Sequence, residues 1–167
     1  MPIDASALVA LIDGELDCLS DARVLRHIRS LLVAPSAVLR AWNYGAPGER
    51  YPCWAVLDHP PSNTGIAYCD RGFGPRCPWG LVWLGGDRPM SIGMDSSWFP
   101  TFLGAYFDSF ASTDLPIWRV FEVTSTTRVA VTDESAWEFA WERVRDCQQR
   151  EPPRRYEVGH SIRYRQE

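Results

Sequence analysis

The stretch YPCWAVLDHPPSNTGIAYCDRGFGPRCPWGLVWL, residues 51–84, decides the fold class of this chain. Short apolar runs at 53–58, 65–69 and 80–84 are separated by segments rich in Gly and Pro, which is the pattern of strands joined by turns. A fourth apolar run is found at 90–94. The connectors at 59–64, 70–78 and 85–89 are shorter than the roughly dozen residues that a parallel crossover needs. We therefore predict a mainly antiparallel β-sheet.

Helical patterns lie on both sides of this stretch. Apolar residues at helical spacing predict one helix over 8–16 and a second after Ser20 and Asp21, with a short further turn at 36–42 beyond Pro35. A third helix, expected at 98–111 with its buried face including Phe102 and Phe110, carries six aromatic residues and should pack on the sheet. A hairpin at 118–131 and a helix at 136–147 complete the predicted α+β fold.

The chain is expected to form one domain over 1–149, followed by a polar, Arg-rich tail over 150–167. Pro152 and Pro153 should end the last helix, so the tail is predicted to be dispensable for folding. The alternative is that the tail docks onto the domain through Tyr156, Val158 and Tyr164.

Composition and charge exclude or disfavour several classes of protein. The 167 residues are 46% hydrophobic and 13% aromatic, which excludes a disordered or low-complexity chain. No apolar run approaches the roughly 18–20 residues of a membrane span, and the N-terminus is too acidic for a signal peptide, so a cytoplasmic location is expected. All 17 basic residues are Arg, and the net charge of −4 argues against nucleic-acid binding.

The sequence predicts no catalytic residue, metal or cofactor. The odd number of cysteines, five, is typical of reduced thiols rather than a disulfide framework. A zinc site built from Cys53, His59, Cys69 and Cys77 would lack the short C-x₂₋₄-C spacing of structural zinc. A Cys53–His59 nucleophile pair has no local signature around Cys53, and phosphate-loop and hydrolase motifs do not occur.

The connector at 70–78 is the predicted partner-binding segment. It places Arg71, Phe73 and Arg76 among glycines and prolines, where side chains tend to project from the surface. Arg and aromatic residues are the types that most often dominate protein interfaces. The alternative is a plain strand connector with Phe73 folded back onto the sheet.

Five motifs, WNYG (42–45), YPCWAVLDHP (51–60), TGIAYCDRGFGP (64–75), PWGLVWL (78–84) and SIGMDSSWFPTFLGAYF (91–107), resemble an uncharacterised bacterial family of small soluble proteins. Proteins of this type include immunity proteins of toxin–immunity loci. The resemblance spans less than half of the chain, and it implies a compact α+β module without established catalytic residues.

The function expected from this resemblance is that of a cytoplasmic immunity or inhibitor protein, which neutralises a toxin or effector by occluding its active site. Two alternatives stay open. One is a small-molecule enzyme that uses the 70–78 connector, with Arg71, Cys69 or Asp95 as its polar groups. The other is a phage-encoded inhibitor of a host defence complex.

Overall fold

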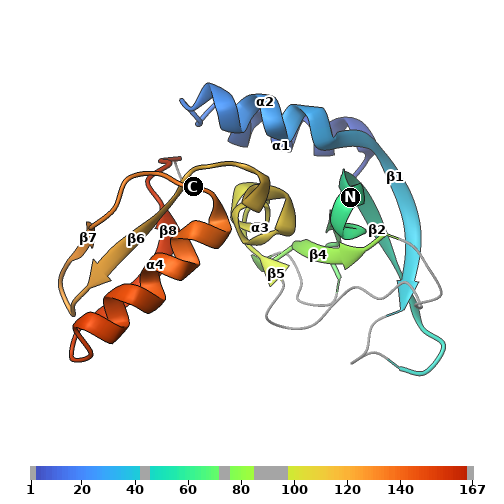
Figure 1. Ribbon diagram of the computed structural model, residues 1–167. Helices are drawn as coiled ribbons and strands as arrows, with labels where there is room; N and C mark the ends of the chain where they lie inside the picture. Colours follow the sequence, from blue (N-terminus) through green and yellow to red (C-terminus); the bar gives the residue numbers. More distant parts are fainter. Residues whose placement is uncertain (1–2, 42–45, 72–75, 85–97, 165–167) are drawn as a thin grey trace. The chain divides into compact units, whose positions relative to one another are not determined.

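A computed structural model describes residues 3–41, 46–71, 76–84 and 98–164 of the chain (Figure 1). The chain divides into two compact units, Met1–Ser112 with Tyr164–Glu167 and Thr113–Arg163. The first unit contains α1 (Ala5–Leu16), α2 (Ala22–Leu31), β1 (Leu32–Ala41), β2 (Arg50–His59), β3 (Thr64–Tyr68), β4 (Trp79–Trp83), β5 (Trp98–Phe99) and α3 (Phe102–Asp108). The second contains β6 (Trp118–Val123), β7 (Arg128–Ala130), α4 (Trp137–Arg150) and β8 (Arg155–His160). The predicted α+β class is confirmed.

The sheet of the first unit is an antiparallel meander in the order β1-β2-β3-β4-β5. Its strands β2, β3 and β4 correspond to the apolar runs at 53–58, 65–69 and 80–84, while the run at 90–94 lies outside the described residues. Short 3₁₀ turns occupy Pro60–Ser62 and Phe110–Asp114. None of the helices in the described residues is long and apolar enough to cross a membrane.

The helical turn predicted at 36–42 is wrong, because β1 begins directly after α2 and runs to Ala41. Pro35 lies inside this strand. A proline is tolerated in a strand at the edge of a sheet, and among the described strands β1 lies at the edge, next to β2. The register between β1 and β2 shifts between Leu32 and Ser36, around the proline.

The three helices of the first unit pack against its sheet, and α1 also packs against α3. Helix α1 contacts β1 and α3, α2 contacts β2, and α3 contacts β3, β4 and β5; Figure 1 draws α1 and α2 above β2 and β4. The ring of Phe102 packs edge-on against Trp79 of β4, with 5.4 Å between centroids. This contact confirms the prediction that the aromatic helix packs on the sheet.

Helix α3 is shorter than predicted, since Trp98 belongs to β5 and the helix begins after Thr101. Thr101 caps it by accepting the N–H of Gly104 at 3.0 Å. The carboxylate of Glu15 in α1 accepts the N–H groups of Phe102 and Leu103 at 2.9 and 2.8 Å, which satisfies two more free donors of the first turn. Phe110 lies beyond the helix and is 60% exposed, so its predicted burial is wrong.

The second unit pairs a three-stranded sheet, in the order β7-β6-β8, with helix α4. The hairpin and last helix predicted from the sequence are both present. The structure differs in the predicted tail, where β8 pairs with β6 along its whole length, from Arg155 opposite Val123 to His160 opposite Trp118. The ion pairs Arg128–Glu157 and Arg154–Glu122, at 2.6 and 3.0 Å, join the strands further. Residues 150–163 are therefore part of a compact unit.

Candidate functional site

The 70–78 connector joins β3 to β4, and backbone pairing holds its two ends together. Tyr68 pairs with Trp79, and the N–H of Cys69 donates to the carbonyl of Pro78 at 2.8 Å. Cys69 and Trp79 are 1% and 2% exposed, and Pro78 is buried as well. Both ends of the connector are therefore attached to buried residues that are hydrogen-bonded to each other, Cys69 and Pro78.

The described ends of the connector carry two of the three residues predicted to bind a partner. Arg71 and Arg76 are both exposed, and Phe73 lies outside the described residues. Arg71 comes two positions after Cys69, and its backbone N–H is hydrogen-bonded to the Cys69 sulfur. The structure therefore brings Arg71 and Cys69 together, as the enzyme alternative requires, whereas Asp95 lies outside the described residues.

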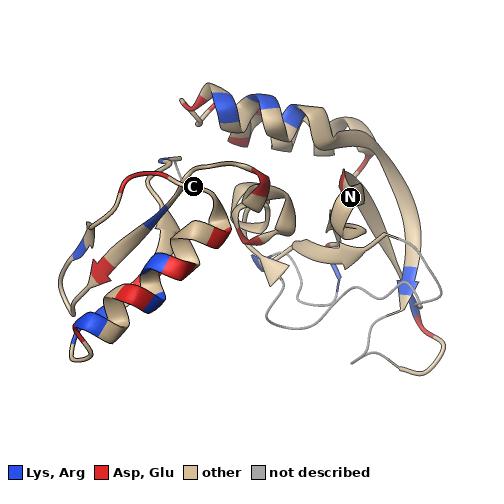
Figure 2. Cartoon of the chain, viewed as in Figure 1, with Lys and Arg blue, Asp and Glu red and all other residues tan. Residues whose placement is uncertain are grey.

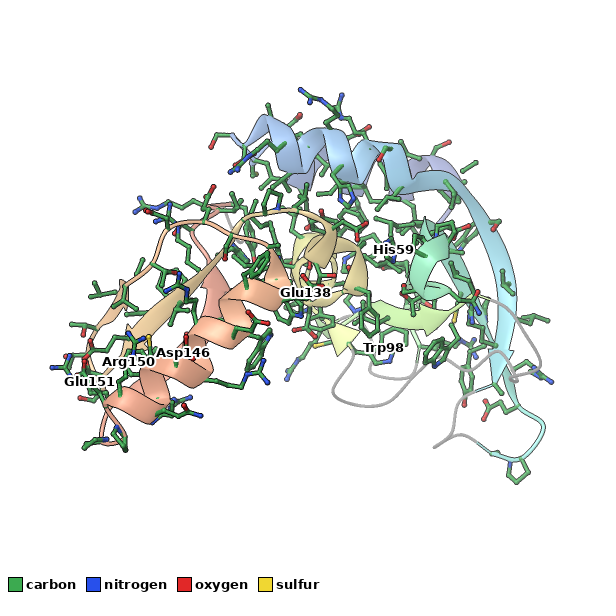
Figure 3. All side chains as sticks on the ribbon, viewed as in Figure 1. His59, Trp98, Glu138, Asp146, Arg150 and Glu151 are labelled. Carbon is green, nitrogen blue, oxygen red and sulfur yellow. The ribbon has the colours of Figure 1, made fainter. Side chains whose placement is uncertain are left out.

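A second cluster lies beneath this connector, on the face of the sheet opposite to the one that α3 covers. Side chains alternate between the faces of a strand, so Trp79 contacts α3 while its neighbour Gly80 faces the other way. We call the buried residues of this second face the thiol cluster: Tyr51, Cys53, Ala67, Cys69, Val82 and Trp98, with Cys77 and Leu84 packed against them. Figure 3 marks Trp98 on β5.

Gly80 makes room for the ring of Trp98 in the thiol cluster. The two residues are opposite each other in the β4–β5 pairing. A Cβ atom at position 80 would lie only 2.6 Å from the Trp98 ring, so a side chain there would displace the indole. The glycine thus allows Trp98 to cover this face of the sheet, where it is 7% exposed.

Cys53 and Cys69 are adjacent across β2 and β3. Trp54 is opposite Tyr68, so the next pair along the two chains is Cys53 and Cys69. The hydrogen bond between the two sulfurs, together with burial, raises the pKa of Cys53. The same hydrogen bond lowers the pKa of Cys69, helped by the N–H of Arg71 and opposed by burial. The two shifts have opposite directions, which favours the proton on Cys53 and negative charge on Cys69.

A buried cation lies on the same face of the sheet. Arg40 is opposite Tyr51 in the β1–β2 pairing and is 2% exposed. One of its terminal nitrogens, Nη1, donates to the carbonyl of Trp83 at 2.9 Å, and its Nε has no hydrogen-bond partner among the described residues. Burial lowers the pKa of Arg40, and negative charge on Cys53 or Asp58 would raise it. The guanidinium thus places positive charge near Cys53.

The other ionisable residues discussed for the sequence do not form a site in the part of the chain that the structure describes. His59 (Figure 3) lies at the far end of β2 from Cys53, and its Nδ1 is 2.7 Å from the hydroxyl of Ser62. Among the described residues, no group of three or more His, Cys, Asp or Glu side chains is arranged so that it could hold a metal ion. On α4, Glu138 and Glu142 are exposed among arginines (Figure 2), as expected for a solvated helix face.

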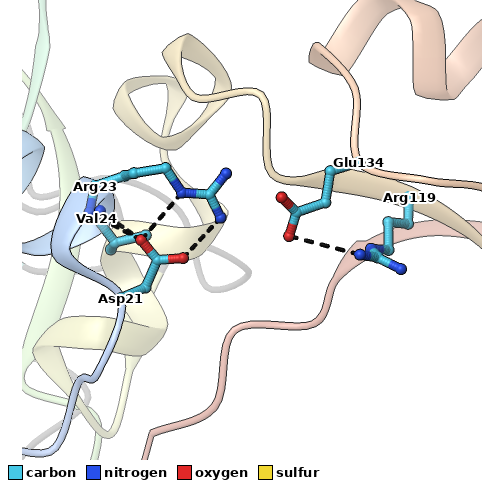
Figure 4. Close-up of polar contacts among 5 residues, drawn as sticks. All are labelled: Asp21, Arg23, Val24, Arg119 and Glu134. Carbon is cyan, nitrogen blue, oxygen red and sulfur yellow. Dashed lines mark hydrogen bonds and ion pairs between the residues drawn. The ribbon is translucent and has the colours of Figure 1, made fainter.

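Polar contacts elsewhere in the described residues have structural roles. In the first unit, Asp21 caps α2 by accepting the N–H groups of Arg23 and Val24, and its carboxylate also pairs with the Arg23 side chain at 2.7 Å. In the second unit, Arg119 and Glu134 lie 3.8 Å apart (Figure 4). These surface pairs are worth little individually and indicate no reaction.

The second unit also exposes large apolar side chains. Four residues within Thr113–Arg163 have exposed fractions between 43% and 62%: Val129, Val131, Phe139 and Trp141.

No family model matches the chain, and no curated protein or solved structure is significantly similar to it. What the chain does is therefore inferred from its own residues.

Proposed function

We propose that this protein is a binding module of the immunity or inhibitor type, which recognises a toxin or effector protein through the connector between β3 and β4 and blocks its active site. The observation that carries the proposal is the position of Arg71 and Arg76. Both are exposed at the ends of a connector whose base is closed by the hydrogen bond from Cys69 to Pro78.

This arrangement suits recognition for two physical reasons. Arg covers a large area and offers a planar set of donors, which fits carboxylates and aromatic rings on a partner. A connector whose ends are fixed before binding loses less conformational entropy on association than a free loop does.

The resemblance seen in residues 42–107 supports the same class of function, because it points to immunity proteins and to no catalytic residue. A phage-encoded inhibitor of a defence complex would use the same occluding surface and differ in its partner. The partner therefore distinguishes these two functions, and the connector is common to both.

The proposal predicts that Arg71→Ala and Arg76→Ala each weaken binding to the partner by about 2 kcal/mol or more, roughly a 30-fold rise in Kd. The melting temperature should stay that of the parent, because both side chains are exposed. Arg26→Ala is the matched control, an Arg on α2 whose loss should leave Kd unchanged. Titration calorimetry of the three variants measures this, and an unchanged Kd for both connector variants would remove the connector from the interface.

A further inference from the structure

We propose that Cys53 and Cys69 form a redox-active dithiol, which a small hydroperoxide oxidises to a disulfide bridging β2 and β3. The inference goes beyond partner binding and does not depend on it. It is carried by three observations: the two cysteines directly follow the pair Trp54–Tyr68 of β2 and β3, both are buried in the thiol cluster, and the buried Arg40 lies on the same face of the sheet.

The pairing brings the two cysteines within reach of a disulfide. Residues directly opposite each other in an antiparallel pair have Cα atoms roughly 4.5–5.5 Å apart. Disulfides span Cα separations of about 4.4–6.8 Å, so a bond between these positions needs little movement of the backbone. Cys53 and Cys69 are the next residues beyond the pair Trp54–Tyr68, and both are buried in the thiol cluster.

The surroundings assign a different role to each sulfur. Cys69 receives hydrogen bonds from the Cys53 thiol and from the N–H of Arg71, and both stabilise a thiolate on Cys69. Cys53 keeps its proton as the donor of the shared hydrogen bond. Cys69 is thus the nucleophile and Cys53 the resolving thiol. Arg40 adds positive charge on the side of Cys53, which favours negative charge in the pair as a whole.

The burial of the two sulfurs limits the size of the oxidant that can reach them. Cys53 and Cys69 are 0% and 1% exposed, so a bulky disulfide such as that of a tripeptide thiol has no approach to either sulfur. A hydroperoxide is small and uncharged, and thiolates react with it to give a sulfenic acid.

The reaction balances with a hydroperoxide as the only oxidant. The Cys69 thiolate attacks one peroxide oxygen, the O–O bond breaks, and the departing oxygen takes up a proton to leave as water or an alcohol. The sulfur of Cys53 then attacks the sulfenic sulfur of Cys69. The S–S bond forms, the S–O bond breaks, and the hydroxyl leaves as water with the proton of the Cys53 thiol. The two cysteines lose two electrons in total, and the peroxide gains them.

Peptide mapping of the full-length protein tests the proposal directly. Trypsin cleaves after Arg50 and Arg71, so both cysteines fall within one peptide, residues 51–71. The native protein is treated with hydrogen peroxide, quenched with acid, alkylated with iodoacetamide under denaturing conditions and digested. We expect peptide 51–71 to lose both alkyl groups and the mass of two hydrogen atoms, and to regain both alkylation sites when dithiothreitol is added before alkylation.

Two outcomes of the mapping would overturn the proposal. The first is that peptide 51–71 keeps both alkylation sites after a treatment that oxidises the half-buried Cys18. The second is a bond from either cysteine to Cys77, which joins two different tryptic peptides and is thus distinguishable by mass. Cys147→Ala is the matched control, because it removes a half-buried thiol of the second unit and should leave the oxidation of peptide 51–71 unchanged.

The roles of the two sulfurs are tested with dimedone, which traps sulfenic acids. Cys53→Ala removes the resolving thiol, so dimedone added together with denaturant after peroxide treatment should label Cys69. Cys69→Ala should leave Cys53 unlabelled. Labelling of Cys53 in the second variant, or the absence of label on Cys69 in the first while its circular dichroism spectrum matches the parent, would contradict the assignment.

Discussion

At the scale of single residues, two phenylalanines from the same aromatic stretch have opposite environments. Phe102 is fully buried against Trp79, whereas Phe110 is 60% exposed. Truncation of a buried Phe to Ala typically costs about 3–5 kcal/mol, including the cavity it leaves. We therefore expect Phe102→Ala to lower the free energy of unfolding by that amount and Phe110→Ala to change it by less than about 0.5 kcal/mol. Urea unfolding measured by tryptophan fluorescence gives both values, and equal midpoints for the two variants would show that the buried face is misassigned.

His160 predicts a pH dependence of stability in the second unit. Its ring lies edge-on to Trp118 at 5.7 Å, and burial lowers the pKa of His160, as does the charge of Arg128, against a hydrogen bond with the backbone of Ile162. Because the folded-state pKa is below the unfolded value, the unfolded chain binds the proton more readily. The stability contributed by neutral His160 is therefore fully present above pH of about 6.5 and is lost as the pH falls through the folded-state pKa.

The corresponding measurement is the free energy of unfolding across a pH series from about 8 to 5, for the parent and for His160→Gln. The parent should lose stability on the acidic side by at most about 1.4 kcal/mol per pH unit for this one proton, and the variant should lose less. An identical pH dependence in both proteins would mean that His160 does not carry the effect.

The residue-level features missed from the sequence are those that depend on long-range contacts. Local spacing predicts a solvated helix face for His27, yet its Nδ1 lies 2.8 Å from the hydroxyl of Tyr106 in α3. Glu15 caps α3 from a position 87 residues earlier in the chain. Local spacing contains no information about such partners. The pairing of Cys53 with Cys69 did have a local signal, because a hairpin through 59–64 brings the two ends together.

At the scale of elements, β8 is the main departure from the sequence prediction. The segment RYEVGH alternates polar residues with Tyr156 and Val158, which is a strand pattern, but it is short and comes after two prolines. Its stability as a strand comes from β6, where Val120 is opposite Val158 and Glu122 is opposite Tyr156. A partner strand more than thirty positions away cannot be recognised from the segment alone.

A chain ending at Arg150 is therefore expected to lose the fold of the second unit. Removal of β8 leaves one edge of β6 unpaired and uncovers Val120 and Phe121, which are buried in the intact protein. The matched control is a chain ending at Arg163, which keeps β8 intact. Near-ultraviolet circular dichroism should show loss of the tryptophan signal from Trp118, Trp137 and Trp141 in the first chain and its retention in the second. Equal spectra and melting temperatures would contradict the role assigned to β8.

Strand β1 shows how tertiary pairing overrides a local rule. Pro35 correctly indicates that a helix does not continue, and α2 ends at Leu31. The conformation of the next segment cannot be predicted locally, because LLVAPSAVLRA suits a short turn or an edge strand equally well. Pairing with β2 stabilises the strand conformation of this segment. The same pairing buries Arg40 beside the thiol cluster.

At the scale of the whole molecule, the fold class and most elements can be predicted from hydrophobic periodicity and turn residues, whereas the division into two units cannot. The segment 112–116, STDLP, has turn residues like those of the other connectors, so nothing local distinguishes it as a boundary between two units. Of the candidate site, Arg71 and Arg76 are exposed at the ends of the connector, and Phe73 lies outside the described residues.

The most direct test of the central claim, that this protein neutralises a protein partner, is growth rescue in a bacterial host. Each gene that flanks the coding sequence is expressed from an inducible promoter, alone and together with this chain. We predict that one flanking product arrests growth, that co-expression of this chain restores growth, and that the Arg71→Ala, Arg76→Ala double variant restores it less well than Arg26→Ala does. Growth arrest that this chain fails to relieve, or flanking products that are all harmless, would contradict the claim.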